Sequence, residues 1–170
     1  CSTTDPGVYF PYAIEIDNTG TNLYVVDYDG RVQKFTTSLT FVSSFDGTGG
    51  AGKFSQPQDA AVDGSGNVYV ADTYNNRIQK YNSSYAFQAA ESSTNDATDP
   101  LFNGADGLAV APNGNLWVAD YNNSRVVELT PAGTVVKKVG GNNGDGSCGS
   151  GPGQFCNPAA VAVDSVGNLF

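Results

Sequence analysis

The chain contains one pattern four times over, and this internal repeat restricts the fold more than any other feature of the sequence. The clearest copy is Gln56–Tyr81, in which three short apolar runs are separated by turn-forming residues. Runs of about five residues joined by such short turns are typical of an antiparallel meander, because neither turn can hold a crossover helix. Related copies begin at Pro11, Ala105 and Pro158.

Three aspartates mark the period of the repeat. Asp72 lies 45 residues after Asp27, and Asp120 lies 48 residues after Asp72. A repeat of about this length with four short strands is typical of one blade of a β-propeller. We therefore predict an all-β propeller segment over residues 1–170, with three complete four-stranded antiparallel blades and the start of a fourth, which makes a partial ring.

The blades are expected at residues 11–56, 57–104, 105–157 and 158–170, the last being incomplete. Their first strands are rich in alanine, valine and glycine, small residues that suit the crowded centre of a propeller. The strands expected are Ala13–Asp17, Asn22–Asp27, Arg31–Thr36 and Phe41–Phe45 in the first blade, Asp59–Asp63, Asn67–Asp72, Arg77–Asn82 and Ala86–Glu91 in the second, Gly107–Ala111, Asn115–Asp120, Arg125–Thr130 and Thr134–Val139 in the third, and Ala160–Asp164 and Asn168–Phe170 in the fourth.

The repeat resembles the NHL repeat, best in Pro57–Tyr81 and Asp106–Leu129. The shared pattern is Pro-x-x-(Ala/Gly)-x-(Ala/Val)-Asp-x-x-Gly-Asn-(Val/Leu)-(Tyr/Trp)-Val-Ala-Asp-x-x-Asn-x-Arg-(Ile/Val), and a Gly-x-Phe lead-in occurs at Gly52–Phe54 and Gly153–Phe155. The resemblance runs across essentially the whole chain and implies a β-propeller. It does not imply one activity, because a single fold hosts many functions.

An aromatic residue recurs at one position of the second strand in every blade. These residues are Tyr24, Tyr69, Trp117 and Phe170. Aromatic side chains at blade spacing favour the core between blades over a ligand site. We therefore expect all four to be buried.

All three arginines occupy one position of the repeat, four or five residues after its aspartate. The resulting pairs are Asp27 with Arg31, Asp72 with Arg77 and Asp120 with Arg125. This spacing crosses the turn between the second and third strands, so the guanidinium can reach the carboxylate or the turn carbonyls. We interpret the pairs as structural; the less favoured alternative is a ring of acid/base or metal-binding aspartates.

The three cysteines fall into a predicted disulfide and an odd residue. Cys148 and Cys156 lie eight residues apart in a glycine-rich linker, and a bridge between them would add roughly 2–3 kcal/mol of stability in an oxidising compartment. Cys1 lies ten residues before Pro11, at the phase of the repeat that Cys148 occupies. It is interpreted either as the start of a fragment, which we favour, or as the lipid-modified N-terminus of a lipoprotein.

Charge and composition exclude several classes of partner. The formal net charge is −9, from 17 acidic and 8 basic residues, whereas nucleic acids and anionic membranes both require a basic face. No apolar run approaches the ~20 residues of a membrane span. A polar, turn-rich β composition predicts an extracellular or cell-surface protein, in which the sequons at Asn82 and Asn122 are candidate glycosylation sites.

The candidate chemistry is limited to carboxylates, because the chain has no histidine. Catalysis by Ser-His-Asp or Cys-His and histidine-bound zinc are therefore excluded within it. Peptide-amidating lyases that share the repeat depend on histidine-ligated metal, which this sequence cannot supply. A metal-dependent, lactonase-like hydrolase would have to use Glu15, on an innermost strand, and Asp17, Asp63 and Asp164, at the ends of such strands. The loop Asn142–Asp145 could hold Ca²⁺ through oxygen ligands, although a turn-forming role is favoured.

The favoured function is that of a secreted or surface-displayed binding or structural module rather than an enzyme. Its expected partners are further propeller blades or copies of itself, with a protein or carbohydrate ligand. Because the sequence stops within the second strand of the fourth blade, we expect another chain or a further segment to complete that blade. The hydrolase remains the alternative, with a site that needs additional blades, and no cofactor other than Ca²⁺ is predicted.

Overall fold

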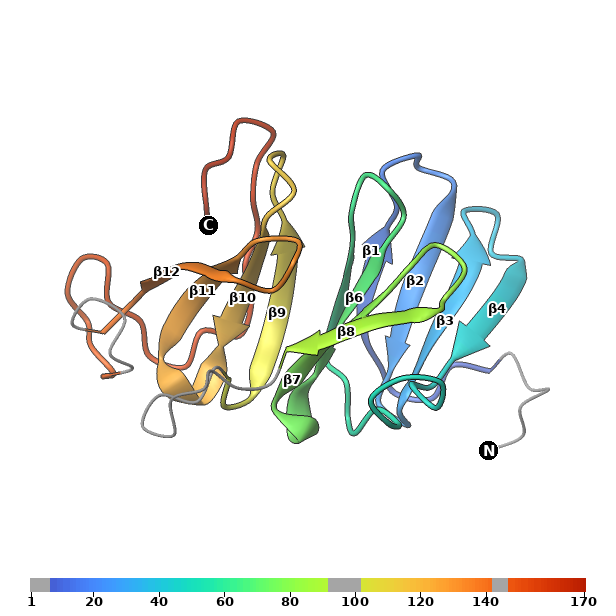
Figure 1. Ribbon diagram of the computed structural model, residues 1–170, viewed down its shortest axis with the longest axis horizontal. Helices are drawn as coiled ribbons and strands as arrows, with labels where there is room; N and C mark the ends of the chain where they lie inside the picture. Colours follow the sequence, from blue (N-terminus) through green and yellow to red (C-terminus); the bar gives the residue numbers. More distant parts are fainter. Residues whose placement is uncertain (1–6, 92–101, 142–146) are drawn as a thin grey trace.

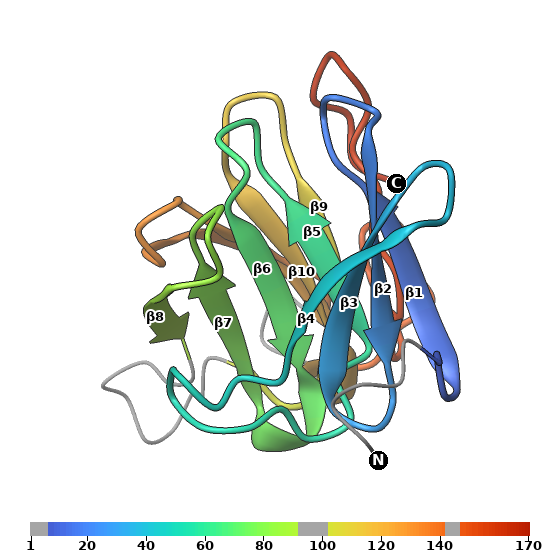
Figure 2. The ribbon, with the colours of Figure 1, turned by 90° about the vertical axis from the view of Figure 1, so that its right-hand side faces the viewer.

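A computed structural model describes residues 7–91, 102–141 and 147–170 of the chain, and its strands form three antiparallel sheets of four strands each. The sheets stand side by side in chain order (Figures 1 and 2). The prediction of four-stranded propeller blades is confirmed. The strands are β1 (Pro11–Ile16), β2 (Asn22–Asp27), β3 (Arg31–Thr36) and β4 (Phe41–Phe45) in blade 1, β5 (Asp59–Val62), β6 (Val68–Asp72), β7 (Arg77–Tyr81) and β8 (Phe87–Glu91) in blade 2, and β9 (Ala105–Val110), β10 (Leu116–Asp120), β11 (Arg125–Leu129) and β12 (Val135–Val139) in blade 3.

The start of the fourth blade is a hairpin rather than a pair of regular strands. Ala162 and Phe170 exchange backbone hydrogen bonds of 2.9 and 2.8 Å, and Val163 pairs with Leu169 in an isolated bridge. The hairpin lies against blade 3 at backbone contact distance, since a Cβ on Gly107 would approach the Cα of Ala160 to 2.6 Å. The repeat thus continues past blade 3 in the expected direction.

An aspartate holds the first hairpin turn in blade 1, in blade 2 and in the fourth-blade hairpin, whereas blade 3 has Ala111 at this position and Asn113 accepts the turn hydrogen bond. In the β5–β6 turn, Asp63 Oδ1 accepts hydrogen bonds from the amides of Ser65 and Asn67, both at 2.9 Å, and Oδ2 accepts one from Asn67 Nδ2 at 2.7 Å. Gly66 has a φ of 79°, a left-handed conformation that favours glycine. The Asp-x-x-Gly-Asn part of the repeat is therefore a turn sequence.

The core lies between successive blades and is built by the same repeat positions each time. On β5, Ala60 and Val62 face blade 1 and pack in one buried cluster with Tyr24, Val26 and Val32. The next interface places Leu108 of β9 in a cluster with Tyr69 and Ile78 of blade 2. The third interface places Trp117 against the fourth-blade hairpin. Each blade thus offers two small or branched apolar residues to the aromatic side of the blade before it.

The expected aromatic core is correct at three positions and wrong at the fourth. Tyr24, Tyr69 and Trp117 are buried, whereas 75% of Phe170 is exposed. Tyr24 and Tyr69 are covered by the first strand of the following blade and Trp117 by the fourth-blade hairpin, whereas no strand of the described chain covers Phe170. Position in the repeat therefore predicts burial only where a following blade is present.

A lysine lies over the buried aromatic ring of every complete blade, but not always from the same strand. In blades 1 and 2 it comes from the third strand, with Lys34 Nζ 5.4 Å from the Tyr24 ring centroid and Lys80 Nζ 5.0 Å from that of Tyr69. In blade 3 the corresponding position is Glu128, and Lys137 of β12 lies 5.0 Å from the Trp117 ring instead. The cation–π contact is retained by a different residue.

Candidate functional site

Each predicted aspartate–arginine pair is brought together at the end of its blade. Arg31 Nε lies 3.0 Å from Asp27 Oδ2, and the equivalent distances are 2.6 Å in blade 2 and 2.8 Å in blade 3. All three aspartates are fully buried. The pairs close the turns between the second and third strands, which carry the one-turn helices η1 (Thr73–Asn75) and η2 (Tyr121–Asn123) in blades 2 and 3.

The blade 2 pair also anchors the linker that leads into the blade. Asp72 Oδ1 accepts a 2.7 Å hydrogen bond from the Ser55 amide, and Oδ2 accepts one of 2.9 Å from Gln79 Nε2. Arg77 donates to the carbonyl oxygens of Ala51 at 2.7 Å and Gly52 at 3.1 Å. The charged atoms of this pair are therefore used by the protein itself, which gives the pair a structural role.

Blade 3 varies this network. Val127 stands where blades 1 and 2 have Gln33 and Gln79, so no glutamine among the described residues donates to the buried carboxylate of Asp120. Burial raises the pKa of Asp120, although hydrogen bonds from the Asn103 amide and the side chains of Asn123 and Arg125 oppose this shift. From the sequence we expected the three pairs to be equivalent, and Val127 is the residue that indicates a difference in blade 3.

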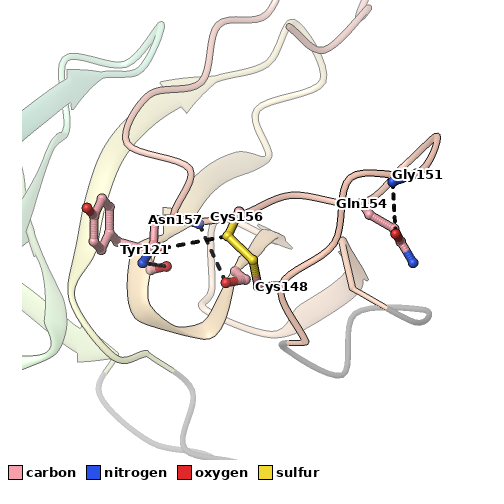
Figure 3. Close-up of a disulfide and its surroundings, with 7 residues drawn as sticks. Tyr121, Cys148, Gly151, Gln154, Cys156 and Asn157 are labelled. Atoms are coloured by element: carbon pink, nitrogen blue, oxygen red, sulfur yellow. Dashed lines mark hydrogen bonds between the residues drawn. A yellow bond between two sulfur atoms is a disulfide. The ribbon is translucent and has the colours of Figure 1, made fainter.

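The predicted cysteines lie together in the structure. A disulfide joins Cys148 and Cys156, whose Cα atoms are 4.6 Å apart (Figure 3). The neighbouring Asn157 donates through Nδ2 to the Tyr121 carbonyl oxygen at 3.3 Å, which ties the linker to η2. Cys1 and the whole of the proposed Ca²⁺ loop Asn142–Asp145 lie outside the described residues.

The aspartates considered for a metal site are occupied by their own turns. Asp17 and Asp164 hold hairpins as Asp63 does. Hydrogen bonds from the side chain and backbone of Asn168 hold the pKa of Asp164 below its usual value. At Asp17 burial acts in the opposite direction, but hydrogen bonds from Asn22 and Thr19 outweigh it, and the pKa lies well below its usual range. These carboxylates stabilise turns.

Three other carboxylates lie on the innermost strands, and only the first was singled out from the sequence. Burial, with the nearby charge of Asp59, raises the pKa of Glu15 to about 7. Burial raises the pKa of Asp59 to about 6, even though Asp59 Oδ2 accepts a 2.7 Å hydrogen bond from the Leu108 amide of the next blade. Burial also raises the pKa of Asp106 to about 6. Asp59 and Asp106 could have been found from the sequence, because each is an acidic residue at a repeat position where the other blades have a small or neutral residue.

Two hollows lie at opposite ends of the blades. The end that carries the first hairpin turns has a hollow of about 620 Å³ that includes Glu15, Asp63 and Asp164. The other end, shown at the bottom of Figure 1, carries η1 and η2, with a cleft of about 460 Å³ between them. We call it the η1–η2 cleft; its lining residues are Gln58, Thr73, Tyr74, Asn76, Gly104, Asp106, Tyr121 and Asn122.

The remaining sequence-based candidates lie apart from one another. Asn82 is in the β7–β8 turn, where its Oδ1 accepts hydrogen bonds from the amides of Ser84 and Ala86, both at 3.0 Å. Asn122 is exposed on η2. Within residues 7–91, 102–141 and 147–170, no three acidic, histidine or cysteine side chains gather closely enough to hold a metal ion. No membrane-spanning helix occurs in the described part of the chain.

Comparisons with known proteins identify the repeat and the fold. The family model "NHL repeat" matches residues 54–81 and 102–129, which are in blades 2 and 3. The chain therefore carries NHL repeats and has the β-propeller fold. A search of curated protein sequences found no match.

The solved structures that resemble the chain are propellers of diverse function. A streptogramin B lyase structure is 16% identical with a TM-score of 0.66, covering 98% of this chain and 48% of that one. A catalytically inactive virginiamycin B lyase from Staphylococcus aureus, crystallised with quinupristin, is 15% identical with a TM-score of 0.66, at 94% and 47% coverage. Kuenenia stuttgartiensis hydrazine synthase is 13% identical with a TM-score of 0.71, at 99% and 43% coverage. The chain thus spans about half the length of these proteins, and the likeness shows the fold alone.

Proposed function

We propose that the chain acts as a non-catalytic binding module of a secreted or surface-displayed β-propeller. The observation that carries this proposal is the η1–η2 cleft. Its walls supply amide, hydroxyl and aromatic groups, with Asp106 as the charged side chain. Such a lining suits hydrogen bonding and ring contacts with a ligand.

The carboxylates support binding over hydrolysis. A lactonase-like metal site would draw on Asp17, Asp63 and Asp164, but each of these accepts several hydrogen bonds within its own turn. Glu15 lies at the other end of the blades from the η1–η2 cleft and lines the larger hollow with two of these occupied carboxylates. The fold is also compatible with many activities, so the lyases among the similar structures do not favour catalysis.

The disulfide supports a location outside the cytosol. Disulfides persist in oxidising compartments and are rare in the cytosol, and Cys148 and Cys156 both lie in an exposed linker that reducing agents could reach. The sequons at Asn82 and Asn122 are usable only in such a compartment.

A turnover assay tests the non-catalytic assignment. The purified chain is incubated with a panel of lactones and aryl esters, with and without Ca²⁺, and its melting temperature is measured under both conditions. We expect hydrolysis at the rate of the buffer blank and no Ca²⁺-dependent rise in melting temperature. Turnover that is lost in Glu15→Gln would contradict the proposal and favour the hydrolase.

A second proposal concerns assembly, and it rests on the exposed face of blade 1. Ile14 and Ile16 of β1 are 65% and 49% exposed, although the residues at the same repeat positions, Ala60 and Val62, are buried under blade 1. In each internal interface the covering surface is the aromatic side of another blade of this repeat. We propose that a second copy of the chain covers blade 1, with its exposed Phe170 in the place that Tyr24 takes over Ala60 and Val62.

Light scattering of the purified chain at about 50 μM, where micromolar contacts are populated, tests this association. We expect a mass above that of the monomer, and a return to the monomer mass in Ile14→Lys. The control is Val136→Lys, which places the same charge on an exposed apolar position of β12 and should leave the mass unchanged. A monomeric parent chain at this concentration would rule the assembly out.

A further inference from the structure

Hydrogen bonds within the protein shape the η1–η2 cleft without a ligand, and each of them involves the backbone of β9 or of the residue before it. Thr73 Oγ1 donates to the Ala105 carbonyl oxygen at 2.8 Å, and Asn76 Oδ1 accepts from the Gly104 amide at 2.7 Å. The Tyr121 amide donates to the Gly104 carbonyl oxygen at 3.1 Å. These bonds join β9 and the turns of two blades into one rigid floor. A preformed site of this kind loses little conformational entropy when a ligand binds.

Gly104 keeps room for a polar side chain at the floor of the cleft. Its φ is 71°, and a Cβ at this position would approach the Asn122 amide nitrogen to 2.8 Å. Blades 1 and 4 have Phe10 and Asn157 at the equivalent position, with similar left-handed φ values of 55° and 52°. Glycine is therefore not required by the backbone alone, and its use here leaves the Asn122 amide within the cleft.

Two tyrosines stand at the edges of the cleft with their rings available. Tyr74 of η1 is 63% exposed and Tyr121 of η2 is 38% exposed. In blade 1 the ring of Tyr28 is used differently, because it stacks on Tyr12 at a centroid distance of 5.4 Å. Neither Tyr74 nor Tyr121 has such a ring contact among the described residues. Exposed aromatic pairs beside polar groups are typical of ligand-contacting surfaces.

The polar groups between the tyrosines are only partly satisfied by the protein. Asp106 is half-buried, and its carboxylate accepts no hydrogen bond from the residues that the structure describes. The Gln58 side chain and the Asn76 Nδ2 donor are likewise without a partner in the described chain. Asn76 is exposed and Asp106 and Gln58 are half-buried, so these groups are open to hydrogen bonds from a ligand that displaces water.

We propose that the η1–η2 cleft binds a neutral oligosaccharide. Sugar rings present apolar C–H faces, which match the open faces of Tyr74 and Tyr121. Their hydroxyl groups can donate to the Asp106 carboxylate and exchange hydrogen bonds with the Gln58 and Asn76 amides. An anionic sugar would meet the Asp106 charge and a chain of net charge −9, with no cationic side chain in the cleft to offset them. This inference rests on the proposed binding function and adds the ligand class.

The test uses the full chain made in a bacterial host, so that Asn122 is unmodified and no attached glycan fills the cleft. Cellohexaose, xylohexaose, mannohexaose and maltohexaose are titrated by calorimetry at neutral pH, with hexagalacturonate as the anionic probe. We expect at least one neutral hexasaccharide to bind with a Kd of about 1 mM or tighter, and the anionic probe to bind more weakly. No binding by any neutral probe would overturn the proposal.

Matched variants locate the binding. The Tyr74→Ala/Tyr121→Ala double variant should weaken binding at least about tenfold, whereas Tyr74→Phe/Tyr121→Phe, which keeps the ring faces, should retain most of it. Tyr12→Ala removes a similarly exposed tyrosine outside the cleft and should have no effect. Trp117 fluorescence verifies that each variant is folded. Unchanged affinity in the alanine double variant would place the sugar elsewhere and contradict the proposal.

A failure of the sugar-binding proposal can be distinguished from a failure of the proposed non-catalytic function. If no hexasaccharide binds and the lactone and ester panel is not turned over, the ligand class is wrong and the non-catalytic function stands. If turnover occurs and depends on Glu15, the proposed function itself is wrong, whatever the sugar titrations show.

Discussion

Replacing Asp72 with alanine should lower the free energy of unfolding by about 3–5 kcal/mol, a large part of the stability of a domain of this size. Asp72 is fully buried and accepts hydrogen bonds from the Ser55 amide, Asn75 Nδ2, Arg77 Nε and Gln79 Nε2. Alanine leaves all four donors without this acceptor, and one of them is a guanidinium that is mostly buried. An uncompensated buried charge costs more than the lost pair contributed.

Urea unfolding followed by Trp117 fluorescence measures this loss, because Trp117 is the sole tryptophan and is buried in blade 3. The matched control is Asp46→Ala. Asp46 also pairs with a basic residue, Lys53, at 3.3 Å, but both side chains are exposed, so the expected loss is below about 1 kcal/mol. Similar losses in the two variants would show that the buried pair is not a special determinant of blade stability.

The aspartate–arginine contact could be predicted from spacing because both residues belong to one hairpin. In an antiparallel pair, residues on either side of a tight turn face each other, and Asp72 is indeed the register partner of Arg77. The further partners, Ser55 and Gly52, could not be predicted in the same way. They belong to the preceding linker, whose path is fixed by tertiary contacts rather than by strand periodicity.

Burial of apolar side chains was predictable only where the neighbouring blade was known. The repeat assigned Phe170 to a core position by analogy with Tyr69, and Ile14 occupies the repeat position of the buried Ala60. Their exposure follows from the faces that the described chain leaves uncovered, and a sequence pattern within a single blade does not encode which blade comes next. Contacts within a blade are local in sequence, whereas contacts between blades depend on the arrangement of the ring.

The candidate site was the least predictable part. The η1–η2 cleft depends on two turns that are 48 residues apart and whose residues differ: Tyr74 aligns with Asn122, and Tyr121 with Thr73. The cleft is formed by residues of two copies of the repeat, so the sequence pattern of one copy does not predict it. Exposed tyrosines in equivalent turns of consecutive blades were the available clue.

The second large effect is a fall in stability as the pH rises from about 5 to about 8. Glu15, Asp59 and Asp106 have raised pKa values in the folded chain, about 7 for the first and about 6 for the other two. Between the unfolded and folded pKa values, the folded state therefore binds more protons than the unfolded state. Stability decreases with pH wherever the folded state binds more protons, so it is greatest on the acid side of this window.

At lower pH, the aspartates that hold hairpin turns make the stability rise with increasing pH. The pKa values of Asp17 and Asp164 lie below their usual value in the folded chain, so their contribution is present above about pH 4 and is lost as the pH falls further. The two groups together place the maximum of stability between about pH 4 and 5.5, on the acid side of neutrality. Calorimetric melting at constant ionic strength across this range measures both slopes.

The variant Asp59→Asn isolates the contribution of one carboxylate to the loss of stability between about pH 5 and pH 8. Asparagine keeps an oxygen that can accept a hydrogen bond from the Leu108 amide but cannot ionise, so the difference in stability between about pH 5 and pH 8 should shrink by about 1.4 kcal/mol. Asp46→Asn serves as the control, because the pKa of Asp46 is lowered, chiefly by its hydrogen bond from Thr48, and its titration falls below this window. An unchanged dependence of stability on pH in Asp59→Asn would mean that water reaches this carboxylate and that the innermost strands do not bury it.

Asp59→Ala separates the two roles of the side chain, ionisation and hydrogen bonding. The dependence of stability on pH should shrink as in Asp59→Asn. The alanine variant should, however, be less stable than Asp59→Asn at every pH, because the Leu108 amide then has no acceptor.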